Sequence, residues 1–256
     1  MADLIDGTGV HVPAKSVGLG SDYPSAMVAC KYLRKNGKKG VLSNIPRVQD
    51  AKEIDLRLIS KKLGFFILQI GDFSTEIELL EPLHSAITDL TKLVLMPEFV
   101  WKYRVRSLEE FRFLWKKQAG MVSHLVLIGH GDKSNLLFGN DKVSANDFLD
   151  AFAIQETQGQ APVIISLCCN SGNGLFGKKV SASPSCKTFI GPSGSIHASN
   201  AALFYQSFLS HSLIDGQQKE KAYQLSRVFT PGVTEFNMWN KTRLATKPSR
   251  KDVLGH

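Results

Sequence analysis

The sequence predicts an α/β fold with a mainly parallel central sheet flanked by helices. Two patterns in the 256 residues support this class: short apolar runs that end at glycine or small polar residues, and amphipathic segments between them. An apolar run of this kind is typical of a strand buried on both faces, and strand–helix alternation is typical of parallel sheets. The hydrophobic content of 43% and charged content of 21% match an ordinary globular protein.

The predicted strands are the apolar runs. Three of them are well defined and occupy residues 65–71, 124–129 and 162–168. A fourth, short strand lies within residues 187–195, and a further short one near the start of the chain lies at 40–45. Because functional groups of parallel sheets collect beyond the carboxyl ends of the strands, the residues after each run are the first place to look for a site.

The predicted helices follow from apolar residues at helical spacing. They cover residues 50–64, 74–90, 107–120, 144–154, 198–214 and 219–229, and a short amphipathic piece lies at 26–33. Ser107 with Glu110 and Thr75 with Glu78 have the spacing of a capping box. Pro82 is unfavourable inside the second helix, so it is expected to split that helix.

The domain organisation that follows is simple. We expect one domain over residues 41–230, preceded by an extension at 1–40 and followed by a basic, weakly patterned tail at 231–256. No run approaches the roughly 18 apolar residues of a membrane span, and the N-terminus has no signal-peptide pattern. Four unevenly spaced cysteines do not make a disulfide scaffold, so we expect a cytoplasmic protein.

The net charge of +8 predicts a basic surface. Such a surface attracts nucleic acid, acidic proteins or anionic membranes, although it can also be no more than a solvated face. The sequence has no zinc-finger spacing, no P-loop and no dinucleotide-binding turn.

Two strand ends carry residues that suit thiol catalysis. The run HLVLIG leads into His130, Gly131 and Asp132, and the run PVIISLC leads into Cys169 and Asn-Ser-Gly. An imidazole beside a thiol can help to form the reactive thiolate and can later protonate a leaving amine. The backbone N–H groups of Gly131 and Cys169 could then hold the oxyanion of a tetrahedral intermediate.

Other interpretations stay open for each residue alone. A histidine at a strand end is often a hydrogen-bonded structural residue, and a cysteine there is often a small hydrophobe. A redox or metal site on Cys168 and Cys169 is disfavoured, because adjacent side chains on a strand point to opposite faces and no further ligands stand at a recognised spacing. We therefore expect no metal and no cofactor.

The blocks HLVLIGHGD and PVIISLCCNSG resemble the caspase-like (clan CD) cysteine proteases, including their CHAT branch. The similarity extends more weakly from about residue 41 to 229. It implies a caspase-like (caspase–hemoglobinase) fold and a thiol endopeptidase in which Cys169 is the nucleophile and His130 the general base and acid. Gly131 and Cys169 would supply the oxyanion hole, and Cys168 would be a packed core residue.

The resemblance also bears on the substrate. Relatives that cut after Arg or Lys carry Asp two residues before the nucleophile, where this chain has Leu167, and Arg47 lies near the position of a caspase arginine that binds acidic residues. The pocket would accept an apolar or small residue, or an acidic one through Arg47. Relatives in bacteria often cut a specific protein in host-defence or cell-death pathways, including antiviral ones, after a trigger from a regulatory partner.

An alternative keeps the fold without the chemistry. The chain would then be a catalytically silent binding module whose basic surface engages nucleic acid or acidic partners. The loop at residues 173–187 is either a segment that rearranges on activation or an ordinary surface loop.

Overall fold

The computed structural model describes residues 64–72, 74–95, 97–153, 161–229 and 236–245, together with a two-stranded antiparallel pair, β1 (Leu4–Ile5) and β2 (His11–Val12). The segments predicted at 26–33, 40–45 and 50–63 lie outside these residues.

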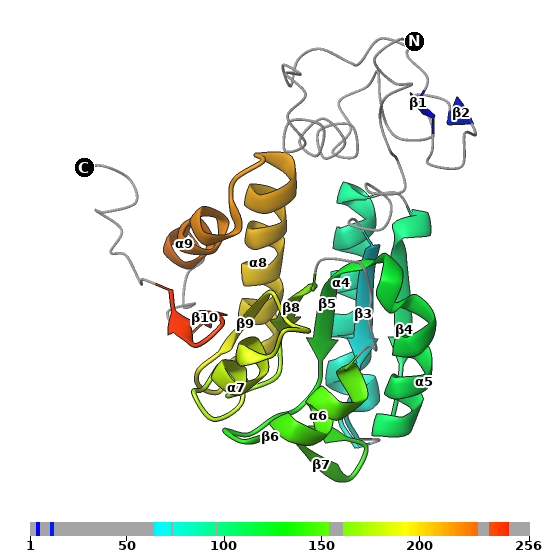
Figure 1. Ribbon diagram of the computed structural model, residues 1–256, viewed down its shortest axis with the longest axis vertical. Helices are drawn as coiled ribbons and strands as arrows, with labels where there is room; N and C mark the ends of the chain where they lie inside the picture. The colour runs from blue at the N-terminus through cyan, green and yellow to red at the C-terminus, as the bar shows by residue number, and fades with distance from the viewer. Residues whose placement is uncertain are drawn as a thin grey trace.

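A seven-stranded sheet forms the centre of the described structure (Figure 1). Its spatial order is β11-β10-β9-β8-β5-β3-β4, and the five strands from β9 to β4 run parallel to one another. β10 pairs antiparallel with β9, and β11 pairs antiparallel with β10. The strands are β3 (Gly64–Gln69), β4 (Val100–Arg104), β5 (Val122–Ile128), β8 (Val163–Ser166), β9 (Thr188–Pro192), β10 (Phe236–Asn240) and β11 (Arg243–Leu244). The prediction of an α/β fold with a mainly parallel sheet is therefore confirmed.

Helices cover both faces of this sheet. One layer contains α4 (Glu81–Val94), α8 (Ala198–Leu209) and α9 (Lys219–Phe229), and the other contains α5 (Leu108–Gln118), α6 (Ala145–Phe152) and α7 (Gly177–Ala182). Shorter helical turns are η2 (Glu76–Leu80), η3 (Pro97–Phe99), η4 (Ala119–Met121) and η5 (Ser210–Ile214), and a hairpin is formed by β6 (Asn135–Phe138) and β7 (Asp141–Ser144).

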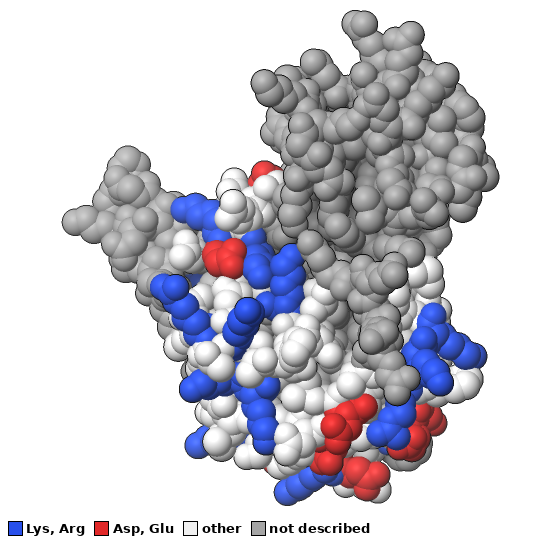
Figure 2. All heavy atoms as spheres, viewed as in Figure 1, with Lys and Arg blue, Asp and Glu red and all other residues white. Residues whose placement is uncertain are grey.

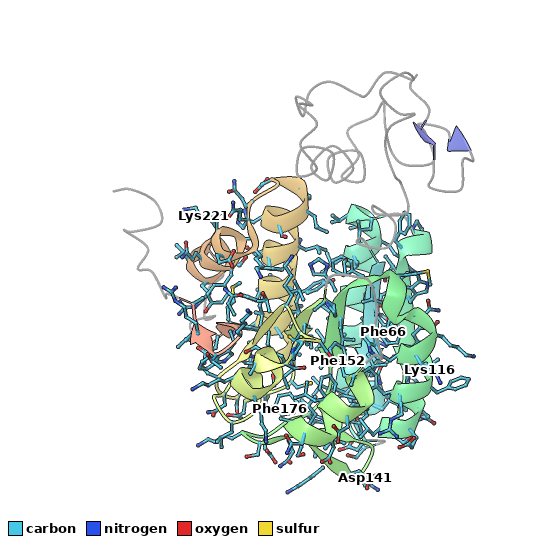
Figure 3. The ribbon with its side chains drawn as sticks, viewed as in Figure 1. Phe66, Lys116, Asp141, Phe152, Phe176 and Lys221 are labelled. Atoms are coloured by element: carbon cyan, nitrogen blue, oxygen red, sulfur yellow. The ribbon has the colours of Figure 1, made fainter. Side chains whose placement is uncertain are left out.

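The alternation of side chains along each strand fills the two layers. In β3, Phe65 and Ile67 pack on the α4–α8 side, whereas Phe66 and Leu68 pack on the α5–α6 side. On the α5–α6 side, Figure 3 shows Phe66, Phe152 and Phe176 inside the molecule, with Lys116 and Asp141 at its periphery. The continuous apolar runs are thus explained by burial on both faces.

Most predicted elements in the described residues are present, with shifted ends. Ser107 caps α5 by accepting a hydrogen bond from the Glu110 backbone at 3.1 Å, as the sequence predicts. Pro82 lies in the first turn of α4, where a missing N–H is harmless, and the preceding segment is a separate π-helical turn, so the predicted split also occurs. The predicted capping role of Thr75 is wrong, because its side chain makes no cap hydrogen bond to that turn.

Four features were not predicted. The edge strand β4 and the hairpin of β6 and β7 were missed, and so was helix α7, which lies in the segment expected to be a loop at residues 173–187. The expectation of a weakly patterned tail is wrong for residues 236–244, where β10 extends the sheet beside β9. Phe236 and Met238 of β10 are buried in the core. The sheet therefore continues beyond residue 230.

Within the described parts of the chain, none of the helices combines the length and the apolar character that a membrane span requires.

Candidate active site

The order in which the chain adds strands to the sheet reverses next to β3. The chain places β4 on one side of β3 and then returns to place β5 on the other side, followed by β8 and β9. In open α/β sheets, ligands bind beyond the carboxyl ends of the strands at such a switch point. Asp72 and Thr75 follow β3, His130 follows β5 and Cys169 follows β8, so all four lie at this edge.

The turn that carries His130 is held by backbone hydrogen bonds on both sides. The His130 carbonyl accepts from Leu137 N at 3.0 Å, and Asp132 N donates to the Asn135 carbonyl at 2.9 Å. These two bonds flank the isolated bridge between Gly131 and Leu136, so the Gly131 N–H takes no part in this pairing.

The Asp132 carboxylate closes the same turn from the other end. Its Oδ1 accepts from the backbone N–H groups of Ser134 at 2.7 Å and Asn135 at 2.8 Å, which is an Asx-type turn. Desolvation raises the pKa of Asp132, but the hydrogen bonds from Ser134 and Asn135 together outweigh it, so the pKa lies below its ordinary value. The carboxylate is therefore charged at neutral pH and fixes the loop after Gly131.

The turn that carries Cys169 is built from buried serine hydroxyl groups. Ser171 Oγ lies 2.7 Å from both Ser166 Oγ and the Cys168 carbonyl, and Cys168 N donates to Ser166 Oγ at 3.3 Å. Asn170 has φ 59°, a left-handed conformation that asparagine adopts more readily than most residues. The Asn-Ser part of the motif thus has a conformational role and a hydrogen-bonding role.

Gly172 ends this turn against the next strand. A Cβ atom at Gly172 would lie 1.9 Å from the Gly191 carbonyl oxygen of β9. Gly172 N donates to the Pro192 carbonyl at 2.7 Å, and its own carbonyl accepts from Trp239 Nε1 at 2.8 Å and Asn237 Nδ2 at 3.1 Å. The glycine is required because β9 approaches too closely for a side chain.

The two adjacent cysteines have different environments. Cys168 is 0% exposed in the core, and burial raises the pKa of its thiol to about 12, whereas Cys169 is partly exposed at the sheet edge. Both are free thiols. Because the thiolate is the reactive species, Cys168 is unsuited to nucleophilic chemistry and Cys169 is the accessible thiol.

The two turns meet at Gly131. A Cβ atom at this residue would lie 2.9 Å from the Cys169 carbonyl oxygen and 3.3 Å from the Cys168 Cβ. A side chain would therefore push the histidine turn away from the cysteine turn. The glycine that follows His130 in the sequence allows this close approach.

The two backbone N–H groups expected to bind an oxyanion lie in these turns. The Gly131 N–H is outside the pairing described above, and among the described residues the Cys169 N–H enters none of the backbone hydrogen bonds that hold its turn. Neighbours in the same turn are used instead: Asn170 N donates to the Gly194 carbonyl at 2.9 Å and Ser171 N to the Cys168 carbonyl at 3.3 Å.

The Cys169 thiol contacts the segment after β9. Sγ accepts from Ile196 N at 3.4 Å and lies 3.7 Å from the Ile196 carbonyl oxygen. Among the described residues, the hydrogen bonds of Cys169 Sγ are to the Ile196 backbone and that of the His130 imidazole is between Nε2 and Thr75, so none joins the thiol to the imidazole. Catalytic hydrogen bonds often form only when substrate is bound.

The imidazole of His130 is bound to a residue after β3. Its Nε2 lies 2.6 Å from Thr75 Oγ1, and Thr75 Oγ1 also lies 3.0 Å from Asp72 Oδ1. Hydrogen bonds from Ser74 and then Thr75 lower the pKa of the Asp72 carboxyl, with a smaller contribution from the charge of His130. Three polar side chains from two strand ends therefore form one chain of contacts.

An ion cluster anchors the segment that begins at Thr75. Glu76 is 7% exposed and pairs with Arg104, the last residue of β4, and with Arg106 just after that strand, each at 2.5 Å. Arg104 also contacts Glu81 at the start of α4. Since removing one member of such a cluster leaves a poorly solvated charge, Glu76 fixes the start of η2 beside the site.

Of the two residues predicted for a substrate pocket, the structure describes only Leu167. Arg47 lies outside the described residues. Leu167 is 4% exposed and packs in the core on the α4–α8 side, and its backbone N–H donates to the Leu127 carbonyl at 2.8 Å. Their roles in substrate binding stay predictions.

Two contributors were not identified from the sequence. The sequence predicts Thr75 to be a helix cap. No residue-type pattern could have identified Ile196, because its contact with Cys169 is made by the backbone. Thr75 and His130 are far apart in the chain, and only the pairing of β3 with β5 brings them together.

No protein-family model matches the sequence, and no curated protein is significantly similar to it. These two comparisons therefore assign no family to this chain.

Proposed function

We propose that this protein is a caspase-like cysteine endopeptidase in which Cys169 is the nucleophile and His130 the general base and acid. The observation that supports this most directly is the contact of Gly131 with Cys169, which puts the two predicted motifs on adjoining turns at the switch point of a parallel sheet. The buried state of Cys168 supports the choice of Cys169 between the two thiols.

The reaction would proceed through an acyl-enzyme. The thiol proton passes to His130, Sγ forms a bond with the carbonyl carbon of the scissile peptide, and the oxyanion accepts from the N–H groups of Gly131 and Cys169. The C–N bond then breaks as His130 gives its proton to the leaving amine. Water, deprotonated by His130, hydrolyses the thioester and restores the thiol. Sγ must exchange its contact with Ile196 for the substrate carbonyl before attack.

The substrate would be a specific protein. Leu167 is apolar and stands where relatives that cut after basic residues have Asp, so we propose a small or apolar residue before the cut, or an acidic one if Arg47 reaches the pocket. Cleavage of a defence or cell-death partner after a regulatory trigger is part of the same proposal and is carried by the resemblance alone.

The cysteine pair supplies a matched test. A positional-scanning peptide library is incubated with the wild type, Cys169→Ala and Cys168→Ala, and cleavage is measured. We expect Cys168→Ala to keep the wild-type preference and Cys169→Ala to fall to background, a loss of about 10³-fold or more. Equal cleavage by Cys169→Ala and wild type would overturn the proposal.

If the wild-type protein cleaves none of the peptides, a second measurement tests whether His130 activates the thiol. The rate at which iodoacetamide alkylates Cys169, located by peptide mapping, is compared between wild type and His130→Ala. We expect alkylation to slow in the variant if the imidazole activates the thiol. Absence of peptide cleavage together with equal alkylation rates would exclude the enzyme.

A second candidate function is a binding module, and the charge distribution favours it. The described residues from 161 onward contain eight Lys and Arg but only two Asp and Glu, whereas those from 64 to 153 contain nine and twelve. Figure 2 shows Lys and Arg side chains gathered over the region of α7, α9 and β10, with acidic side chains mainly towards the β6–β7 end. Such a face would suit nucleic acid.

This candidate predicts a steep salt dependence. Binding to a fluorescent 20-mer RNA or DNA duplex is measured between about 50 and 200 mM salt, where neutralising several phosphates would reduce affinity by orders of magnitude. Lys178→Glu with Lys241→Glu, both exposed, should weaken binding, and Lys116→Glu with Lys117→Glu, exposed on α5 outside this face, is the control. No binding at the lowest salt would exclude this function.

A further inference from the structure

The Thr75 hydroxyl lies between the Asp72 carboxylate and the imidazole of His130. Thr75 Oγ1 lies 3.0 Å from Asp72 Oδ1 and 2.6 Å from His130 Nε2. The same carboxylate oxygen also accepts from Thr75 N at 3.0 Å and Ser74 Oγ at 2.8 Å. Asp72 therefore has several donors directed at one oxygen and is held as an acceptor.

The number of protons available to Asp72, Thr75 and the neutral imidazole of His130 favours one arrangement of their hydrogen bonds. A hydroxyl has one proton to donate, and a carboxylate can only accept, so the Thr75 proton must point to Asp72. Thr75 Oγ1 then accepts from His130, which requires the imidazole proton on Nε2. The opposite tautomer would direct the Thr75 proton to Nε2 and leave two oxygen acceptors facing each other across 3.0 Å.

We propose that Thr75 and Asp72 are positioning residues that hold His130 as the Nε2–H tautomer, with its Nδ1 lone pair available for the Cys169 proton. This inference rests on the proposed function, because it names the atom that would act as base. The proton leaves Sγ and joins Nδ1, so the imidazole becomes a cation whose Nε2–H is still bonded to Thr75. The negative charge of Asp72 lies one hydroxyl group away and stabilises that cation.

The surroundings keep this arrangement rigid. Gly71, with φ 137°, runs beside the imidazole, and a Cβ atom there would lie 3.7 Å from His130 Cδ2 and 2.5 Å from Leu80 Cδ1. The Gly71 carbonyl accepts from Gly139 N at 3.1 Å. On the other side of Thr75, Glu76 is held by its two arginine partners. Gly71 and Glu76, which lie on either side of the contact between Thr75 and His130, are thus each bonded to another part of the fold.

The test uses variants that separate the hydroxyl from the shape of Thr75. Thr75→Val keeps the volume and removes the hydroxyl, and Thr75→Ser keeps the hydroxyl. The control Ser123→Ala removes a hydroxyl at the start of β5, where it contacts Gly64 and His124 and not Asp72 or His130. The probe is iodoacetamide at about pH 7, and alkylation of Cys169 in the full chain is followed by peptide mapping. Urea unfolding shows which variants stay folded.

We expect Thr75→Val to slow alkylation of Cys169 by about 10- to 100-fold, because orientation of a general base contributes on that scale. Thr75→Ser should recover to within about threefold of wild type, and the control Ser123→Ala should also stay within that range. A wild-type rate in folded Thr75→Val, or the same loss in Thr75→Ser as in Thr75→Val, would overturn the proposal.

A second readout does not depend on catalysis. In Cys169→Ala protein with ¹⁵N-labelled histidine at about pH 8, where an ordinary histidine is neutral, two-bond ¹H–¹⁵N correlations show which nitrogen is protonated, and His130→Gln assigns the signal. We expect Nε2–H in this protein and a mixture of tautomers once Thr75→Val is added. An Nδ1–H signal would refute the positioning role, even for an active protease. The Nε2–H signal in a protein without cleavage or activation of Cys169 would uphold the geometry and refute the protease.

Discussion

Charged groups hold the half of the candidate site that follows β3 and β5, whereas close packing holds the half that follows β8. We call these the His130 side (Asp72, Thr75, Glu76, His130 and Asp132) and the Cys169 side (Ser166, Cys169, Ser171, Gly172 and Gly191). On the His130 side, three carboxylates each fix a loop through hydrogen bonds or ion pairs. On the Cys169 side, neutral hydroxyl groups and glycines lie in the core.

This difference matches what each half would do in the proposed reaction. A general base must gain and lose a proton, so its neighbours have to respond to its charge. A nucleophile must stand at one place relative to two N–H groups, and a packed turn without side-chain freedom fixes such a place well. The two halves should therefore fail under different perturbations: added atoms on the Cys169 side and changes of charge or pH on the His130 side.

The largest expected effect is that of an added methyl group on the Cys169 side. In Gly172→Ala, the new Cβ would meet the Gly191 carbonyl oxygen at 1.9 Å, and both are backbone positions fixed by hydrogen bonds. Neither can move without breaking the pairing of the turn with β9, so we expect the free energy of unfolding to fall by about 4 kcal/mol or more. Urea unfolding followed by circular dichroism measures it.

The control lies two residues away in the same turn. Gly174→Ala adds the same methyl group where nothing lies within 4 Å. Its effect should stay within about 0.5 kcal/mol of wild type. Equal losses in the two variants would mean that the packing of Gly172 against β9 is not what holds the Cys169 side.

The same contrast explains which parts of the fold the sequence predicts. The buried strands β3, β5, β8 and β9 are visible as continuous apolar runs, because both of their faces pack against helices. β4 is an edge strand with alternating exposure and carries Lys102 and Arg104, and in β10 two asparagines interrupt the apolar residues. The strands that join them to the sheet, β3 for β4 and β9 for β10, are distant in the chain, so no local pattern reveals them.

The candidate site is predictable to a similar extent. His130 and Cys169 stand at strand ends beside glycines, and a rule about parallel sheets is enough to place them at one edge. Thr75 could not be assigned, because the spacing to Glu78 predicts a helix cap and the competing contact with His130 is tertiary. Ile196 acts through its backbone, which carries no residue-type signal.

The next effect concerns pH and lies in α4, the helix that follows η2 beside the His130 side. His84 of α4 packs next to β3, and burial lowers its pKa to about 4, with a further contribution from the charge of Lys102. The folded protein therefore holds this histidine neutral, while the unfolded chain protonates near the ordinary value of about 6.5. Its contribution is complete above about pH 6.5 and is lost as the pH falls towards 4, by about 3 kcal/mol in total.

Two variants check this assignment. His84→Leu should flatten the stability profile between about pH 6.5 and 4, and His197→Gln, an exposed histidine beside the Cys169 side, should leave the profile of wild type unchanged. The measurement is urea unfolding at several pH values. An unchanged slope in His84→Leu would assign the acid sensitivity to other groups and remove this part of the contrast.

The smallest effect is expected for a hydroxyl on the Cys169 side. Ser171 Oγ donates to the Cys168 carbonyl and accepts from Ser166, whose oxygen accepts from Cys168 N, so three groups form a closed ring. Ser171→Ala opens this ring in the core without adding an atom, and we expect a loss of about 1–2 kcal/mol in the free energy of unfolding. Ser195→Ala, at an exposed position after β9, is the control. Because no charge is involved, the loss should be the same at pH values of about 5 and 8; a loss that grows with acid would show that the two sides are electrostatically coupled.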